Sequence, residues 1–203
     1  YFYAPGTCAL AGHIALREAG ADHEIQRVDF KSNEQNSPAF LGVNPKGRVP
    51  ALVTDRGVLT ESPAILAYVA QSFPEAKLAP ADDAFAFAEI QAFNLYLCST
   101  LHVAHAHRPR ASRWADDPAA MEAMKAKVPE NMTSCLRMIE DNMFAGPWVM
   151  GESYTICDPY LFTLGRWMEA DGVDPAGFPR IIAHREAMMA RPAVAEALAL
   201  EEA

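Results

Sequence analysis

The first third of the chain alternates short apolar runs with turn residues. Residues 1–4 are mostly aromatic and stop at Pro5-Gly6, which predicts a strand followed by a turn. Residues 7–19 then have the pattern of a helix, and Gly20 suits the position just after a helix end. We therefore expect the chain to open as strand, turn and helix.

Short strands and helices are predicted as far as residue 73. In chain order they are a strand within residues 23–30, a helical turn at 37–41, strands at 49–53 and 57–60, and a helix at 62–73. The turn signal Asp55-Arg56-Gly57 joins the last two strands as an antiparallel hairpin. The order β-α-β-α-β-β-α predicts a small sheet with helices on its faces.

The composition changes beyond residue 75. Residues 74–83 hold two prolines and two aspartates, as a linker does, and after them Ala, Met, Leu and Glu dominate. Helices are predicted at 84–108, 117–144, 155–170, 178–190 and 192–200. We therefore predict an α/β domain over residues 1–75, a linker over 76–83 and an all-helical domain over 84–203.

The helix expected at 155–170 has the clearest start signal. Thr155 and Asp158 form a Thr-x-x-Asp pattern, in which the Thr155 hydroxyl accepts the Asp158 N–H. The Asp158 carboxylate is expected to reach back to the Thr155 N–H. Apolar residues nearly encircle this helix, which predicts a place at the centre of the helical domain.

Length, charge and hydrophobicity exclude several classes of protein. The 203 residues include 17 Lys and Arg against 26 Asp and Glu, and the net charge of −9 repels nucleic acid. No stretch approaches the roughly 18 consecutive apolar residues that a membrane span requires. The opening residues lack the charged and apolar segments of a signal peptide, so a cytoplasmic location is expected.

The four cysteines are scattered and form no Cys-x-x-Cys motif, so each is judged as a single thiol. Cys8 lies where the first strand gives way to the first helix, beside unpaired backbone N–H groups and the positive end of the helix dipole. Such a position lowers the pKa of a thiol and favours the nucleophilic thiolate. Taken alone, a packing role is the commoner one for such a cysteine, and packing is expected for Cys98, Cys135 and Cys157.

Two further motifs offer groups to a ligand. A cis peptide bond at Val49-Pro50 would turn the backbone of Val49 toward an extended peptide, although X-Pro bonds are usually trans. Ser62 suits an N-cap, with Pro63 at the first helical position. The Ser62 N–H and hydroxyl suit a carboxylate and Glu61 suits an ammonium, which together match the end of an amino acid. An ordinary capped helix with a solvated Glu61 fits equally well.

His102, His105 and His107 cluster near the end of the first long helix. No carboxylate or thiol lies at a spacing that completes a metal site with them, so no metal is expected. We expect one of these histidines to face the cleft between the domains and the others to be solvated beside Arg108 and Arg110.

Five segments carry a family resemblance: residues 1–10 (YFYAPGTCAL), 13–18 (HIALRE), 43–52 (VNPKGRVPAL), 59–62 (LTES) and 154–162 (YTICDPYLF). Together they resemble the cytosolic glutathione S-transferases, and the bacterial beta class in particular. The set is specific although no single segment is. The resemblance implies a thioredoxin-like N-terminal domain, a helical C-terminal domain, a homodimer, and glutathione bound along the first domain.

The resemblance implies glutathione-binding roles for Cys8, Val49, Pro50, Glu61, Ser62 and His102. Cys8 corresponds to the family cysteine that contacts the glutathione sulfur and can form a mixed disulfide with it. Val49, before a cis Pro50, is implied to pair its backbone with the cysteinyl part. Glu61 and Ser62 match the residues that hold the γ-glutamyl group, and His102 matches one that approaches the sulfur from the second domain.

The chain departs from the family pattern in places. Val103 replaces a Lys that often follows the histidine, and Leu95 replaces an Asn. The lysine that beta-class enzymes offer to the glycyl carboxylate falls near Asn33. Arg108 or Arg110 is the substitute that the sequence offers for it.

The implied activity is transfer of a glutathione thiolate, held beside Cys8, to a small hydrophobic electrophile. A mixed disulfide at Cys8 would add thiol-transferase activity. Two alternatives stand beside it: a non-catalytic binding or interaction protein with the same fold, and a glutaredoxin-like reductase that uses a monothiol route. The resemblance also implies that Asp158 is structural.

Overall fold

The computed structural model describes residues 1–80 and 82–202. Its N-terminal part is a four-stranded sheet with the strand order β2-β1-β3-β4. The strands are β1 (Phe2–Tyr3), β2 (Gln26–Arg27), β3 (Ala51–Thr54) and β4 (Gly57–Thr60). β1 is parallel to β2 and antiparallel to β3, and Leu52 lies opposite Leu59 in the antiparallel pair β3–β4. The predicted hairpin is therefore confirmed.

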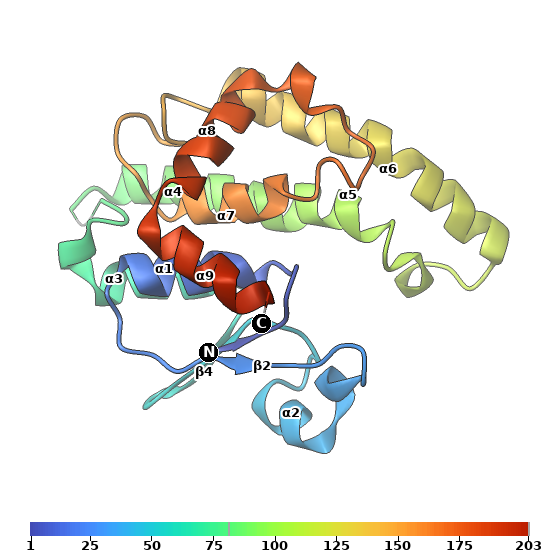
Figure 1. Ribbon diagram of the computed structural model, residues 1–203, viewed down its shortest axis with the longest axis horizontal. Helices are drawn as coiled ribbons and strands as arrows, with labels where there is room; N and C mark the ends of the chain where they lie inside the picture. The colour runs from blue at the N-terminus through green and yellow to red at the C-terminus, as the bar shows by residue number, and fades with distance from the viewer. Residues whose placement is uncertain (81, 203) are drawn as a thin grey trace.

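Three helices cover this sheet, α1 (Ala9–Glu18), α2 (Pro38–Val43) and α3 (Ser62–Ser72). Figure 1 shows α1 and α3 between the sheet and the helical part of the molecule, with α2 on the other side of the sheet. Because α1 is covered on both sides, every residue from Ala9 to Leu16 is buried. The N-terminus of α1 is thereby fixed at the border between the two parts.

The C-terminal part is built from helices, α4 (Ala84–Tyr96), α5 (His102–Ala106), α6 (Pro118–Met138), α7 (Cys157–Gly165), α8 (Pro179–Met189) and α9 (Pro192–Glu202). A π-helical segment, Leu97–Leu101, joins α4 to α5, and a second, Ile139–Met143, follows α6. This arrangement confirms the predicted α/β part followed by a helical part. The boundaries at residues 75 and 84 stay predictions.

Helix α7 lies at the centre of the helical part, as predicted, and all of its residues are buried. At its start the Thr155 N–H donates to Asp158 Oδ2 at 2.6 Å, which confirms half of the predicted capping box. The other half is wrong, because the Thr155 hydroxyl accepts from the Cys157 N–H at 3.3 Å. Asp158 Oδ1 also accepts from the Val149 N–H and lies 3.0 Å from His184 Nε2, contacts that fit a structural role.

The last helix returns to the first part of the chain. Residues of α1, α7, α8 and α9 form one apolar cluster: Leu10, Ile14, Phe162, Met188, Val194 and Ala197. The two parts are therefore held in a fixed relation by a shared core. None of the helices in the described part combines the length and the apolar composition that a bilayer span requires.

Candidate active site

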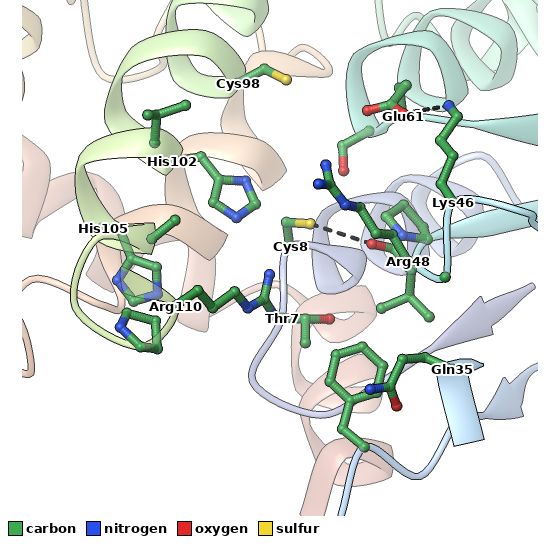
Figure 2. A pocket seen from close by; sticks show the side chains of 18 of the residues that line it. Thr7, Cys8, Gln35, Lys46, Arg48, Glu61, Cys98, His102, His105 and Arg110 are labelled. Carbon is green, nitrogen blue, oxygen red and sulfur yellow. Dashed lines mark hydrogen bonds and ion pairs between the residues drawn. The ribbon is translucent and has the colours of Figure 1, made fainter. Parts of the chain in front are cut away.

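A cavity of about 630 Å³ lies between the two parts of the molecule (Figure 2). One side, here called the sheet wall, consists of residues 6–8, 44, 46–50 and 60–62, with Phe30, Gln35 and Asn36. The other side, here called the helical wall, is made by residues of the segment 98–114 together with Tyr160 and Trp167. The sequence-predicted residues Cys8, Val49, Pro50, Glu61, Ser62 and His102 all line this cavity. Three-dimensional folding thus brings together groups from separate segments of the chain.

Cys8 occupies the N-cap position of α1 and is partly buried. Its Sγ lies 3.8 Å from the Val49 carbonyl oxygen, to which the thiol donates. Burial raises the pKa of Cys8 to about 11, and the opposing effects of the Ser62 hydroxyl and the Arg110 charge are smaller. The prediction of a lowered pKa is therefore wrong: the helix terminus is present, but desolvation outweighs it. Cys8 is a protonated thiol at neutral pH.

Val49 and Pro50 form the edge of the sheet wall where the chain enters β3. The peptide bond between them is cis, as the resemblance implied. Val49 is buried, and its carbonyl faces the Cys8 thiol across the junction of β1 and α1. Backbone groups, rather than long side chains, are therefore what this part of the wall presents.

Glu61 precedes α3 and has a left-handed backbone with φ of 72°, a conformation that costs a non-glycine residue free energy. Its carboxylate accepts from Lys46 Nζ at 2.5 Å, so it already holds an ammonium. Ser62, expected as the N-cap, is instead the first residue of α3, and Glu61 takes the N-cap position. Ser62 is buried beside Cys8, at the positive end of the α3 dipole.

His102 faces the cavity from the helical wall (Figure 2). Burial and the nearby charges of His105, Arg110 and Arg113 lower the pKa of His102 to about 4. The imidazole is therefore uncharged at neutral pH. His102 thus faces the site in the form that hydrogen-bonds without adding a charge.

The other two histidines are not simply solvated, contrary to expectation. His105 also lines the cavity, stacks on Trp167 at 4.0 Å between ring centroids, and places Nδ1 2.7 Å from Asp171 Oδ2. His107 Nδ1 lies 2.8 Å from the Val103 carbonyl oxygen. Asp171, fully buried, was not singled out from the sequence because it lies 66 residues from His105.

Several other lining residues were missed or misplaced by sequence reasoning. Cys98 packs against the core, as expected, but it also lines the cavity. Tyr160 is fully buried, lines the cavity, and has a hydroxyl without a hydrogen-bond partner among the described residues. Burial raises the pKa of Tyr160, so this phenol remains a donor. Apolar residues on every face of α7 concealed which face meets the cavity.

The basic residues of the cavity also differ from expectation. Arg108 does not line it, because its Nε pairs with Asp171 Oδ1 at 2.8 Å, whereas Arg110 does. Two unpredicted arginines, Arg48 and Arg113, line it as well. Figure 2 shows Arg48 and Arg110 directed toward the space beside Cys8 from opposite walls.

This combination of fold and site has known relatives. A family model for the glutathione S-transferase N-terminal domain matches residues 1–71. Glutathione S-transferase GstA of Escherichia coli O157:H7 is 36% identical over 98% of this chain and 97% of its own length. A crystal structure of a glutathione transferase homologue from Sulfitobacter, with bound glutathione, is 44% identical with a TM-score of 0.93, and the match covers 96% of this chain and 94% of that one.

A bacterial beta class glutathione S-transferase from Sphingomonas chungbukensis is 33% identical, with a TM-score of 0.85 and coverage of 98% of this chain and 97% of that one. The chain described here belongs to the glutathione S-transferase family. This membership confirms the predicted family, its fold and the transferase class, and the similarity to a beta class structure supports the predicted class within the family.

Proposed function

We propose that this protein is a glutathione S-transferase that binds glutathione on the sheet wall and joins its sulfur to small electrophiles held on the helical wall. The observation that carries the proposal is the convergence of Cys8, Val49, Glu61, Ser62 and His102 on one cavity. The known names and bound ligand of the relatives support it, because GstA is a glutathione S-transferase and the Sulfitobacter structure contains glutathione.

The sheet wall offers complementary groups along the length of the tripeptide. Glu61, which accepts from the Lys46 ammonium, takes the γ-glutamyl amino group in the same way. Ser62 at the start of α3 offers its N–H and hydroxyl to the γ-glutamyl carboxylate. The cysteinyl backbone pairs with Val49, and Arg48, the residue before Val49, takes the glycyl carboxylate.

This pose places the glutathione sulfur beside Cys8. Because the pKa of Cys8 is about 11, its S–H is available to donate to a glutathione thiolate. The positive charge of Arg110 lowers the pKa of Cys8, and the same charge favours a glutathione thiolate bound beside Cys8. His102 carries no charge at neutral pH, so it orients the sulfur rather than neutralising it. Together these groups favour ionised glutathione where the sulfur meets the second substrate.

The protonation state of Cys8 bears on the type of reaction. Burial raises the pKa of Cys8 to about 11, so the thiol is protonated at pH 7. Direct attack by Cys8 is therefore rare, whereas attack by bound glutathione does not require a Cys8 thiolate. We therefore propose conjugation as the main activity: the thiolate sulfur bonds to carbon and the leaving group departs with its electron pair.

Two further properties belong to the same proposal. Phe85 and Leu95 on α4 are 76% and 54% exposed, and such apolar exposure is explained by cover from a second copy in a homodimer. The four cysteines are free, as is usual in a reducing compartment, and we propose a cytoplasmic location.

Two measurements test the proposal against a non-catalytic scaffold. Calorimetric titration should show glutathione binding in the micromolar to millimolar range, and 1-chloro-2,4-dinitrobenzene should be conjugated faster than in buffer. The proposal fails if glutathione gives no heat of binding. Binding without conjugation of several classes of electrophile would instead favour the scaffold.

A further inference from the structure

The charges that line the cavity are unbalanced. Among the described residues, its charged side chains are the cations Lys46, Arg48, Arg110 and Arg113 and the carboxylate of Glu61. Lys46 and Glu61 pair at 2.5 Å, whereas no carboxylate in the described part of the chain pairs with the three arginines. This positive cavity belongs to a chain with a net charge of −9. Its sign is therefore a local property of the site.

The arginines come from both walls and repel one another. Arg48 precedes Val49 on the sheet wall, and Arg110 and Arg113 lie at the two ends of a short 3₁₀ turn on the helical wall. Burial, and then the charges of Arg110 and Arg48, lower the pKa of Arg113. Like charges held this close raise the free energy of the protein, and a bound anion offsets that cost.

Glutathione accounts for two of these charges under the proposed function. Its glycyl carboxylate pairs with Arg48, and its thiolate lies within the influence of Arg110. Among the described residues, Arg113 is the one arginine of the cavity that this assignment leaves without a group of glutathione to bind. It is next to Trp114, a residue that is 45% exposed and lines the cavity, and whose ring stacks on His107 with 4.3 Å between ring centroids.

We propose that the enzyme prefers planar electrophiles that carry a carboxylate, with the carboxylate on Arg113 and the ring packed on Trp114. An arginine beside an aromatic ring matches both parts of such a molecule. The inference rests on the proposed function. With an aryl chloride, the glutathione sulfur bonds to the ring carbon, the carbon–chlorine bond breaks, and chloride leaves with the electron pair, while the carboxylate is unchanged.

The test uses two electrophiles of similar size and shape, of which one carries a negative charge and the other does not, 4-chloro-3,5-dinitrobenzoate and 4-chloro-3,5-dinitrobenzamide. For each, kcat/KM with saturating glutathione is divided by the uncatalysed rate constant, which removes the difference in intrinsic reactivity. We expect the carboxylate to be preferred, and Arg113→Gln to lower that preference about fivefold, as for an exposed ion pair. Arg113→Lys should retain part of it. Added salt should reduce the preference in the wild type.

Arg56→Gln is the matched control, because Arg56 lies in the exposed β3–β4 turn outside the cavity and should leave the preference unchanged. Equal normalised rates for the two electrophiles, or a preference untouched by Arg113→Gln, overturn the inference while the proposed function stands. If neither electrophile reacts, calorimetry with 3,5-dinitrobenzoate and 3,5-dinitrobenzamide in the presence of glutathione decides the inference. Equal affinities would overturn it, and the missing reaction would count against the proposed function.

Discussion

The two walls of the cavity are made in different ways. The sheet wall presents groups at the ends of secondary structure elements: Cys8 before α1, Val49 before β3, and Glu61 and Ser62 at the start of α3. The positions of such groups follow from the course of the backbone. The helical wall presents side chains from α5, from α7 and from the 3₁₀ turn at 111–113 and its neighbours; examples are His102, Tyr160 and Arg113. The positions of these side chains depend on their rotamers and on how the helices pack.

This difference separates a constant ligand from a variable one. Groups at strand ends and helix termini have positions fixed by the backbone, so they suit a ligand that never changes, as glutathione is in the proposed function. Side chains on packed helices can be replaced one at a time, which alters the shape and charge of the wall. The sheet wall should therefore govern glutathione affinity, and the helical wall should govern the choice of electrophile.

The largest effect is expected for Glu61→Gln on the sheet wall. The substitution removes the charge that holds the γ-glutamyl ammonium, and a hydrogen bond to a charged group contributes about 1.5–3 kcal/mol. We expect the Kd for glutathione to rise about 50-fold in calorimetric titration. Glu75→Gln, at an exposed glutamate outside the cavity, is the control. An unchanged Kd in the folded Glu61→Gln variant would break the division between the walls.

The next largest effect is a dependence of folding stability on pH, which arises from His102 in the helical wall. The pKa of His102 is lowered from 6.5 to about 4 in the folded protein, so between these values only the unfolded chain takes up its proton. The stability that neutral His102 contributes is complete above about pH 6.5 and is lost as the pH falls toward 4. After a discount for partial exposure, we expect a loss of about 2 kcal/mol.

Urea unfolding at pH 7 and pH 4.5 measures that loss as a difference between the wild type and His102→Gln. The comparison is needed because burial also lowers the pKa of His13 to about 4, so the wild type has a second source of acid sensitivity. Identical pH slopes for the two proteins would show that His102 is solvated rather than part of a packed wall.

A smaller effect is expected for Cys8→Ala, which removes the thiol that donates to the glutathione sulfur in the proposed function. The pKa of bound glutathione should rise by about one unit and kcat/KM for conjugation should fall about tenfold, as for loss of one hydrogen bond to a charged group. Thiolate absorbance across pH measures the first quantity. Cys8→Ser should restore most of the rate, and Cys135→Ala, outside the cavity, serves as the control. A tenfold loss that Cys8→Ser does not repair would point to covalent chemistry at the thiol.

The sheet wall could be predicted from the sequence because its signals are local. Turn residues, a helix start and a proline mark Cys8, Val49 and Glu61 within a few residues of each position. What local signals could not supply was the environment of those groups. The pKa of Cys8 is raised by burial, so the helix terminus alone gave the wrong sign.

The helical wall was predicted only in part, for a physical reason. His102 was found through the family resemblance, but Cys98 lies in the π-helical segment after α4 and Tyr160 lies on α7, and both segments are rich in apolar residues. The face that such a helix turns to a cavity is decided by packing against distant segments. The pair of His105 and Asp171 likewise joins residues 66 positions apart, a contact that helical periodicity does not encode.

The smallest effect is expected from removing one of two buried tyrosine hydroxyls, one of which lines the cavity while the other does not. Tyr160 and Tyr154 both have buried hydroxyls without a partner among the described residues, but only Tyr160 lines the cavity. Replacing either with Phe removes an unpaired polar atom, so we expect both variants to keep or gain up to about 1 kcal/mol in unfolding free energy. If the Tyr160 hydroxyl donates to the second substrate, Tyr160→Phe alone should lower kcat/KM, by about threefold, with glutathione affinity unchanged. Equal activity of the two variants would assign Tyr160 to packing, and a loss of glutathione affinity would place it with the sheet wall instead.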